Sequence, residues 1–253
     1  MATISPRALV DAGAELAEDV TVGPFAYVAA GVRAASGCVI GVGATVTGRT
    51  TLGERTEIFP LAVVGASPGG QDDGACEIGE ACAIREHVTV CAGGKRATRI
   101  GSDNLVMIGS VIGAGATVGD HGIFANCTHI GAGATVEDYV RTSAFPVIAD
   151  SVRVGAYTFV NGYASVTRDV PPFAIVEGDP VRVRGVNAEN LRRCGFGDRD
   201  IRALKDAFRQ MYNGTSGRAA PQAVARLLKR DDLNPHVRRA VEAAGDGDGD
   251  ADD

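Results

Sequence analysis

The sequence contains no tryptophan, and aromatic residues make up only 5% of its 253 residues, whereas glycine occurs 34 times. This composition disfavours a core centred on aromatic side chains and is typical of a repeat fold. No apolar run approaches the length needed to cross a bilayer, and the stretch MATISPRALV lacks the basic-then-apolar layout of a secretory signal. We therefore expect a cytoplasmic protein with no membrane span.

Two further classes of binding site are poorly supported. The net charge is −6 and no basic stripe with interleaved aromatics is present, so nucleic acid is not an expected partner. The 6 cysteines include no Cys-x-x-Cys pair, and the 4 histidines show no metal-binding spacing. We expect mostly buried, reduced thiols, no metal site and no cofactor.

What the chain does contain is an aliphatic residue at every sixth position. The pattern is unbroken in frame from Ile100 to Val166, and with two interruptions it extends back to Ile4. A period of six fits neither an α-helix nor a flat strand, and hexapeptide repeats are typical of β-helices. The residues of the frame that are not Ile, Leu or Val are Ala34, Phe124 and Thr142. The sequence predicts an all-β solenoid, a left-handed parallel β-helix with three hexapeptides per coil.

The spacing of this frame also divides the chain. We expect the β-helix over residues 1–170, with loops near 66–77 and 91–99 where the frame lengthens. An exit segment and helices should occupy 171–244, with Asp198 as the cap of one helix and others at 221–228 and 235–244. The acidic, Gly-rich tail 245–253 should be disordered. Flat faces of small side chains favour burial in a cyclic homotrimer with grooves between subunits.

Several segments resemble one family of enzymes. They are VGPFAYV (22–28), IREHVTV (84–90), GSDNLVMI (101–108), RDVPPFAI (168–175) and GVNAENLRRCGF (185–196). The chain resembles the UDP-N-acetylglucosamine O-acyltransferases that begin lipid A biosynthesis, which are trimeric left-handed β-helices with a helical carboxy-terminal region. The resemblance implies an acyltransferase that works in a groove between subunits. Its partners would be an acyl carrier protein or acyl-CoA as donor and a nucleotide sugar as acceptor.

The resemblance fails at the family's catalytic motif, His-x-x-His-Asp. Here Val111 and Ala114 stand where the two histidines belong, and Gly115 stands at the aspartate. In the family the second histidine is the general base, and an alanine cannot accept a proton. The chain is therefore identified as a divergent member that lacks the catalytic histidine. The substrate-binding positions that the resemblance implies are Asp72, Cys91, Asn187, Glu189 and Arg193, with Cys194 in place of a second arginine.

Another residue would have to act as the base. Residues eighteen apart should stack, so Ala114, Ala132 and Asp150 form one column, and Asp150 lies about 10 Å from Ala114, too far for the same proton. We expect His87 and His129 on a neighbouring face, from which either could reach the groove across a trimer interface. These two histidines are the catalytic candidates.

The other titratable side chains have less to support them. His121 is expected on the third face and His236 in the helical region, both with structural roles. Cys91 or Cys127 could form an acyl-cysteine, but each would need a neighbouring group that lowers the thiol pKa. An inert, buried cysteine is the more ordinary expectation.

Three functions stay open at this point. The first is an acyltransferase-like enzyme with a changed base and acceptor. The second is an enzyme of another reaction type, such as a cyclisation, dehydration or hydrolysis in a specialised biosynthetic pathway, that uses His87, His129 or a cysteine. The third is a non-catalytic binding or scaffold protein.

Overall fold

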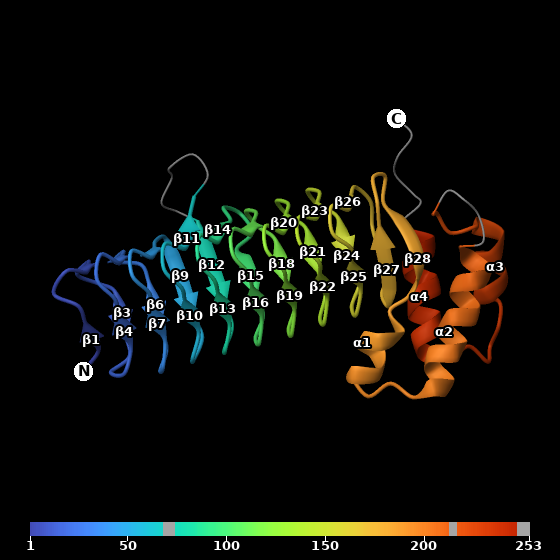
Figure 1. Ribbon diagram of the computed structural model, residues 1–253, viewed down its shortest axis with the longest axis horizontal. Coiled ribbons are helices and arrows are strands. Elements are labelled where there is room, and N and C mark those ends of the chain that lie inside the picture. Colours follow the sequence, from blue (N-terminus) through green and yellow to red (C-terminus); the bar gives the residue numbers. More distant parts are fainter. Residues whose placement is uncertain (68–73, 213–216, 247–253) are drawn as a thin grey trace.

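The computed structural model describes residues 1–67, 74–212 and 217–246. Figure 1 shows a long solenoid of short strands with helices packed at its carboxy-terminal end. The strands of the described residues form three sheets, each running along the solenoid. The predicted parallel β-solenoid with a helical carboxy-terminal region is therefore confirmed.

The hexapeptide frame explains how each strand is built. In the strand Thr21–Val22, for example, Thr21 is exposed and Val22 is buried. Thr21 pairs with Val39 of the next coil and Val22 with Ile40, so residues eighteen apart stack. The exceptions Ala34, Phe124 and Thr142 are buried like the aliphatic residues around them. From Val22 onward the frame therefore fills the interior of the solenoid, whereas Ile4 in the first coil is exposed.

The largest sheet has 11 strands and contains the hairpin that ends the solenoid. Its strands are β1 (Thr3–Ile4), β4 (Thr21–Val22), β7 (Val39–Ile40), β10 (Glu57–Ile58), β13 (Ala83–Ile84), β16 (Leu105–Val106), β19 (Ile123–Phe124), β22 (Arg141–Thr142), β25 (Phe159–Val160), β27 (Ala174–Glu177) and β28 (Arg182–Val186). Its outward side chains become mostly apolar from β13 onward.

The second sheet has 9 strands and the third has 8. The nine-stranded sheet consists of β2 (Leu9–Val10), β5 (Tyr27–Val28), β8 (Thr45–Val46), β11 (Val63–Ala66), β14 (Thr89–Cys91), β17 (Val111–Ile112), β20 (His129–Ile130), β23 (Val147–Ile148) and β26 (Ser165–Val166). The eight-stranded sheet consists of β3 (Glu15–Leu16), β6 (Arg33–Ala34), β9 (Arg49–Leu52), β12 (Ala75–Ile78), β15 (Thr98–Ile100), β18 (Thr117–Val118), β21 (Thr135–Val136) and β24 (Arg153–Val154).

The corners between sheets hold residues in the left-handed backbone region. Tyr139 and Tyr157 adopt φ values of 58° and 60° at the corner between the eight- and eleven-stranded sheets. Their rings stack with centroids 4.8 Å apart, and the column continues to His121 on one side and Phe173 on the other. Stacking along the corner offsets the steric cost of a left-handed conformation in a residue with a side chain.

Both interruptions of the frame lie beside β12. Of the loop expected near 66–77, residues 68–73 lie outside the described part of the chain. The second interruption, 91–99, folds back so that Gly93 forms an antiparallel bridge with Ala75 at the start of β12. The second loop is thus held against the solenoid by backbone pairing.

The exit segment differs from our expectation that the β-helix ends at residue 170. Val170 forms a parallel bridge with Val154, and β27 pairs in parallel with β25. Pro172 does not interrupt this coil because it occupies the corner turn before Phe173, where proline is favoured. The solenoid therefore continues to β27 before β28 returns antiparallel.

Four helices of the described chain follow the hairpin: α1 (Ala188–Arg193), α2 (Asp198–Met211), α3 (Pro221–Leu228) and α4 (Pro235–Asp246). The prediction that Asp198 caps a helix is wrong: Gly197 is the N-cap of α2, and Asp198 is its first helical residue. Helix α3 has the predicted bounds, whereas α4 extends two residues beyond 244. The remaining tail, 247–253, lies outside the described residues.

Candidate active site

Ala114, which stands where the family has its general base, lies at the corner between the nine- and eight-stranded sheets. Ala114 follows β17, and the adjoining Gly115 has a φ of 71° and donates its N–H to Thr98 Oγ1 at 2.8 Å. A Cβ on Gly115 would lie 3.4 Å from the carbonyl oxygen of Arg96. The second loop therefore packs directly beside Ala114.

This loop brings positive charge to the corner. The Arg96 guanidinium donates to Thr117 Oγ1 at 2.7 Å, and Lys95 is exposed beside it. An anionic part of a ligand at this corner would meet two cations that no carboxylate neutralises through an ion pair among the described residues. Such charges stabilise phosphates or a developing oxyanion.

Cys91 begins the same loop, but its thiol is poorly suited to act as a nucleophile. The side chain is half-buried, and burial raises its pKa. A raised pKa keeps the thiol protonated, whereas nucleophilic attack needs the thiolate. The carbonyl oxygen of Cys91 accepts a hydrogen bond from Thr98 Oγ1 at 2.7 Å, so its backbone supports the loop.

His129 lies closer to the family's motif position than we expected. We expected it, like His87, on a face next to that of Ala114. The structure instead puts His129 on the outer side of the nine-stranded sheet, in register with Val111. Val111 is where the first histidine of the motif belongs, so an exposed imidazole lies one coil away, about 4.8 Å along the solenoid axis.

His87 and Cys127 belong to a different part of the molecule. They occupy the corner between the eleven- and nine-stranded sheets, with φ values of 57° and 58°. Gly109 lies between them in this column, since its N–H bonds to the carbonyl of Glu86 and the Cys127 N–H to that of Ile108. A single chain therefore does not bring His87 and His129 together.

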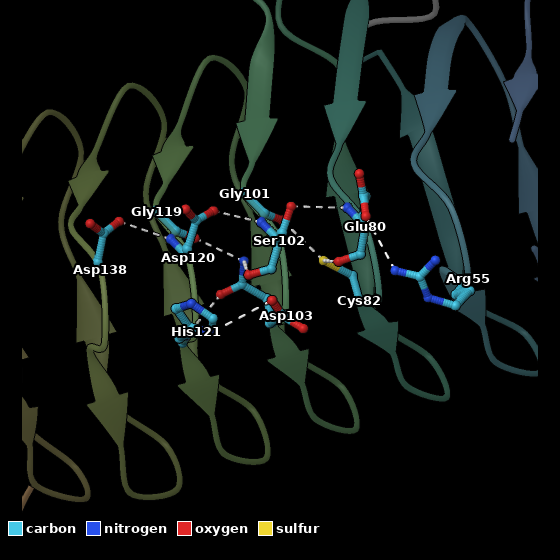
Figure 2. Close-up of polar contacts among 12 residues, drawn as sticks. Arg55, Glu80, Cys82, Gly101, Ser102, Asp103, Gly119, Asp120, His121 and Asp138 are labelled. Carbon is cyan, nitrogen blue, oxygen red and sulfur yellow. Dashed lines mark hydrogen bonds and ion pairs between the residues drawn. The ribbon is translucent and has the colours of Figure 1, made fainter. Parts of the chain in front are cut away.

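The Asp150 side chain stabilises the corner by accepting a backbone hydrogen bond from the preceding coil. Its Oδ1 accepts the N–H of Ala132 at 2.8 Å, one coil back. Figure 2 shows the same arrangement at another corner, where Asp138 accepts the N–H of Asp120 at 2.9 Å and Asp120 accepts that of Ser102 at 2.7 Å. Gly119 permits this approach, because a Cβ there would meet the Asp138 carboxylate.

The two remaining histidines are held by aromatic side chains. His121 stacks on Tyr139 with ring centroids 4.6 Å apart. Figure 2 shows its contact with Asp103, whose carboxylate oxygen lies 3.6 Å from the imidazole. In α4, the His236 ring lies against Phe196 at 4.8 Å. Both contacts fit the structural roles that we expected for these residues.

The substrate-binding positions of the exit segment surround α1. Asn187 caps this helix and is only 6% exposed, and its Nδ2 donates to the Tyr157 carbonyl at 2.8 Å. Glu189 and Arg193 form an exposed ion pair at 3.1 Å. Asn187 therefore fixes α1 to the corner, while Glu189 and Arg193 are available to a ligand. Asp72 lies outside the described residues.

One cation near this segment was missed by the sequence reasoning. Arg141 faces outward from β22, two residues after Tyr139, whose carbonyl accepts a bond from Asn190 of α1 at 3.2 Å. In the sequence, Arg141 is recognisable as a charged residue at an outward position where the two adjacent coils carry Ile123 and Phe159.

Residues 1–67, 74–212 and 217–246 contain no group of three His, Cys, Asp or Glu side chains arranged to hold a metal ion. Within these ranges, no helix combines the length and the apolar character needed to span a bilayer.

Comparison with known proteins places this geometry in a family. A profile described as "Udp N-acetylglucosamine O-acyltransferase; Domain 2" matches residues 169–247. An acyl-(acyl-carrier-protein)–UDP-N-acetylglucosamine O-acyltransferase from an Anaeromyxobacter species is 38% identical over 200 residues, 76% of this chain and 78% of that protein. The chain belongs to the UDP-N-acetylglucosamine O-acyltransferase family. It is an acyltransferase of the hexapeptide-repeat class.

Solved structures of this family have the same architecture. LpxA from Acinetobacter baumannii superposes with a TM-score of 0.88 at 28% identity, covering 96% of this chain and 97% of its own. LpxA of Bacteroides fragilis, described as a UDP-N-acetylglucosamine acyltransferase, gives 0.73 at 29% identity and covers 94% and 95%. The fold is thus shared along nearly the whole chain, while the residues at positions 111 and 114 depart from the motif that the resemblance implied.

Proposed function

We propose that this family member transfers an acyl group from a thioester, carried by an acyl carrier protein or coenzyme A, to a hydroxyl of a nucleotide-sugar-like acceptor. The main support is the position of His129, an outward histidine that pairs with Val111 on the nine-stranded sheet. This sheet leads to the corner at Ala114, where Arg96 and Lys95 supply positive charge. The relative from Anaeromyxobacter is named for an acyl-carrier-protein donor and UDP-N-acetylglucosamine, which supports these two substrate classes.

The proposed reaction needs one base. The His129 imidazole takes the proton of the acceptor hydroxyl, whose oxygen attacks the thioester carbonyl. The ester bond then forms as the carbon–sulfur bond breaks, and the thiolate takes up the proton. Arg96 and Lys95 supply positive charge for the oxyanion or for acceptor phosphates. His129 is preferred to His87 because only His129 lies on the sheet of the motif position.

We further propose that the active form is a homotrimer. Exposed apolar side chains follow the corner between the eleven- and nine-stranded sheets and continue onto the nine-stranded sheet. They are Leu9, Phe25, Leu61, Ile108, Phe145, Val147 and Tyr163. The outward column of the eight-stranded sheet, by contrast, consists of charged and threonine side chains. Apolar surface of this extent favours burial, and a polar face favours solvent.

This distribution gives the trimer a defined arrangement. If the apolar corner points at the three-fold axis, the nine-stranded sheet of one copy faces the eleven-stranded sheet of the next. The outer mouth of the groove is then bounded by Ala114 and the second loop on one side and by α1 on the other. Glu189 and Arg193 would contact the acceptor at this mouth. Because all 6 cysteines are unpaired, we also propose that the protein works in the reducing cytoplasm.

The experiment compares His129→Gln with His87→Gln and His121→Gln as controls. Acyl transfer from acyl-CoA or acyl-carrier-protein donors to UDP-N-acetylglucosamine is followed by mass spectrometry. Loss of general-base catalysis should lower kcat about 100- to 10,000-fold in His129→Gln, with little change in the controls. Full activity of His129→Gln would rule out this base. Failure of donor and acceptor to bind in calorimetry would favour a repurposed or non-catalytic relative.

A further inference from the structure

The eleven-stranded sheet carries a half-buried column of side chains on its outer face. Strand register places the column on successive coils from β13 to β27. Its members are Ala83, Leu105, Ile123, Arg141, Phe159 and Ile175. Arg141 is the only charged residue among them, so this strip is an apolar surface with one cation in its middle.

Arg141 has no partner among the described residues. Its Nε atom is buried without a hydrogen bond. A guanidinium is always charged, and a buried charge without a counter-ion is costly. Something outside the described part of the chain must therefore offset this cost if the strip is covered.

The eight-stranded sheet shows how this protein normally accommodates an outward arginine. Three of its outward arginines pair with a glutamate on a neighbouring coil. The pairs are Arg33 with Glu15 at 3.1 Å, Arg99 with Glu77 at 2.9 Å and Arg153 with Glu137 at 2.8 Å. The corresponding neighbours of Arg141 are Ile123 and Phe159, which cannot neutralise it.

A second copy of the chain does not supply the missing carboxylate from its strands. In the proposed trimer, the nine-stranded sheet faces the Arg141 strip. The outward residues in its strand register are Leu9, Tyr27, Thr45, Val63, Thr89, Val111, His129, Val147 and Ser165. None of these is acidic, which favours a ligand rather than a subunit as the partner of Arg141.

The strip also lies where a substrate would extend from the proposed acceptor site. Asn187 and Asn190 attach α1 to the carbonyls of Tyr157 and Tyr139, immediately before β25 and β22. Ile123, Phe159 and their neighbours suit an alkyl chain, because apolar side chains line most small-molecule sites. A guanidinium fork matches a carboxylate through two parallel hydrogen bonds.

We propose that this strip binds the acyl part of the donor and that Arg141 binds a carboxylate carried on that acyl chain. The chain then selects a carboxy-acyl thioester over an unsubstituted fatty acyl thioester. A plain alkyl chain would cover the guanidinium without pairing it. This inference rests on the proposed transfer of an acyl group from a thioester in the groove between subunits.

The test measures binding of two matched series by calorimetry. One series is the coenzyme A monothioesters of hexanedioic, octanedioic and decanedioic acids, and the other is the thioesters of hexanoic, octanoic and decanoic acids. The native protein should bind at least one dicarboxylic member about tenfold or more tightly than its matched partner, as expected for a charge-assisted pair. Arg141→Leu should abolish this preference, and Arg141→Lys should keep part of it. Arg33→Leu, on the eight-stranded sheet, is the matched control and should change neither series.

Each other outcome has a distinct meaning. Equal or tighter binding of the unsubstituted series by the native protein overturns the inference and leaves the proposed function intact, whereas no binding of either series overturns both. UDP is titrated in parallel, because a phosphate could also pair with Arg141. A loss of UDP affinity in Arg141→Leu with an unchanged acyl preference assigns Arg141 to the nucleotide. Dissociation of the trimer in Arg141→Leu would assign it to the subunit interface and overturn the inference.

Discussion

The eight- and eleven-stranded sheets have the same inner surface and opposite outer surfaces. Inward, both present the buried aliphatic frame, as Leu52 and Ile58 illustrate at less than 2% exposure. Outward, the eight-stranded sheet pairs Arg33 and Arg99 with glutamates, whereas the eleven-stranded sheet surrounds Arg141 with apolar side chains. The repeat that specifies the fold thus leaves the outward residue before each frame position free to set what each face contacts.

The largest effect should come from adding charge to the apolar corner. Phe145→Asp places a carboxylate where Phe145 stacks on Tyr163, and aspartate tolerates the positive φ of 64° at this position. Three such charges near the proposed axis should abolish the trimer at micromolar concentrations. Light scattering after size-exclusion chromatography measures this. Thr135→Asp on the eight-stranded sheet is the control, and a trimer that survives Phe145→Asp would refute the proposed arrangement.

The inner surface of the eight-stranded sheet should respond to alkaline pH. Burial raises the pKa of the inward Cys76 thiol on β12 to about 12. Because the folded chain holds this proton more tightly than the unfolded chain, the stabilisation is complete below about pH 9. The free energy of unfolding then falls by about 1.4 kcal/mol per pH unit towards pH 12. Urea titrations of native protein and Cys76→Ala measure the difference in slope, with Cys127→Ala as control. Identical slopes in all three proteins would contradict the prediction.

The best-shielded ion pair of the eight-stranded sheet should matter more than its others. Glu137 contacts Arg153 at 2.8 Å and Arg239 of α4 at 2.7 Å, and its side chain is 21% exposed. Glu137→Gln should therefore lower the free energy of unfolding by about 1–3 kcal/mol and loosen α4. Denaturation and hydrogen exchange measure these effects. Glu77→Gln, whose partner Arg99 is half exposed, is the matched control and should change much less.

The smallest effect is expected for the exposed pair at the start of the same sheet. Arg33 and Glu15 lie 3.1 Å apart with about two thirds of each side chain exposed. A double-mutant cycle with alanine at both positions should give a coupling energy of about 0.2–1 kcal/mol or less. A coupling above that range would show that the face is shielded from solvent and would weaken its contrast with the eleven-stranded sheet.

Most of the solenoid followed from the sequence, because a strict period of six allows few other ways to bury the aliphatic residues. The end of the solenoid was harder to predict. Val170 and β27 continue the coil although the six-residue frame is no longer visible in the sequence there. Backbone pairing of Val170 with Val154 and of β27 with β25 holds this last coil in place. Helix α1 was missed for a similar reason: it is held by Asn187 and Asn190 bonding to corner carbonyls from distant coils.

The candidate site was predictable only as columns of residues. Counting by eighteen correctly stacked Ala114 with Ala132, as the bond from the Gly133 N–H to the Ala114 carbonyl illustrates. Such counting does not say whether a position lies on a strand or at a corner. His129 was therefore assigned to the wrong face, although it lies on the same sheet as Val111. The roles of Asp72, Glu189 and Arg193 remain predictions.

The periodic interior could be predicted from the sequence, because the position of an inward side chain depends on local spacing and on the next coil alone. The motif substitution at Ala114 was likewise readable without coordinates. Which outward residues share a surface could be seen only in the folded chain, because insertions and corners shift the residue count from one coil to the next. That is how the buried Nε of Arg141 between Ile123 and Phe159, and His129 beside Val111, became visible.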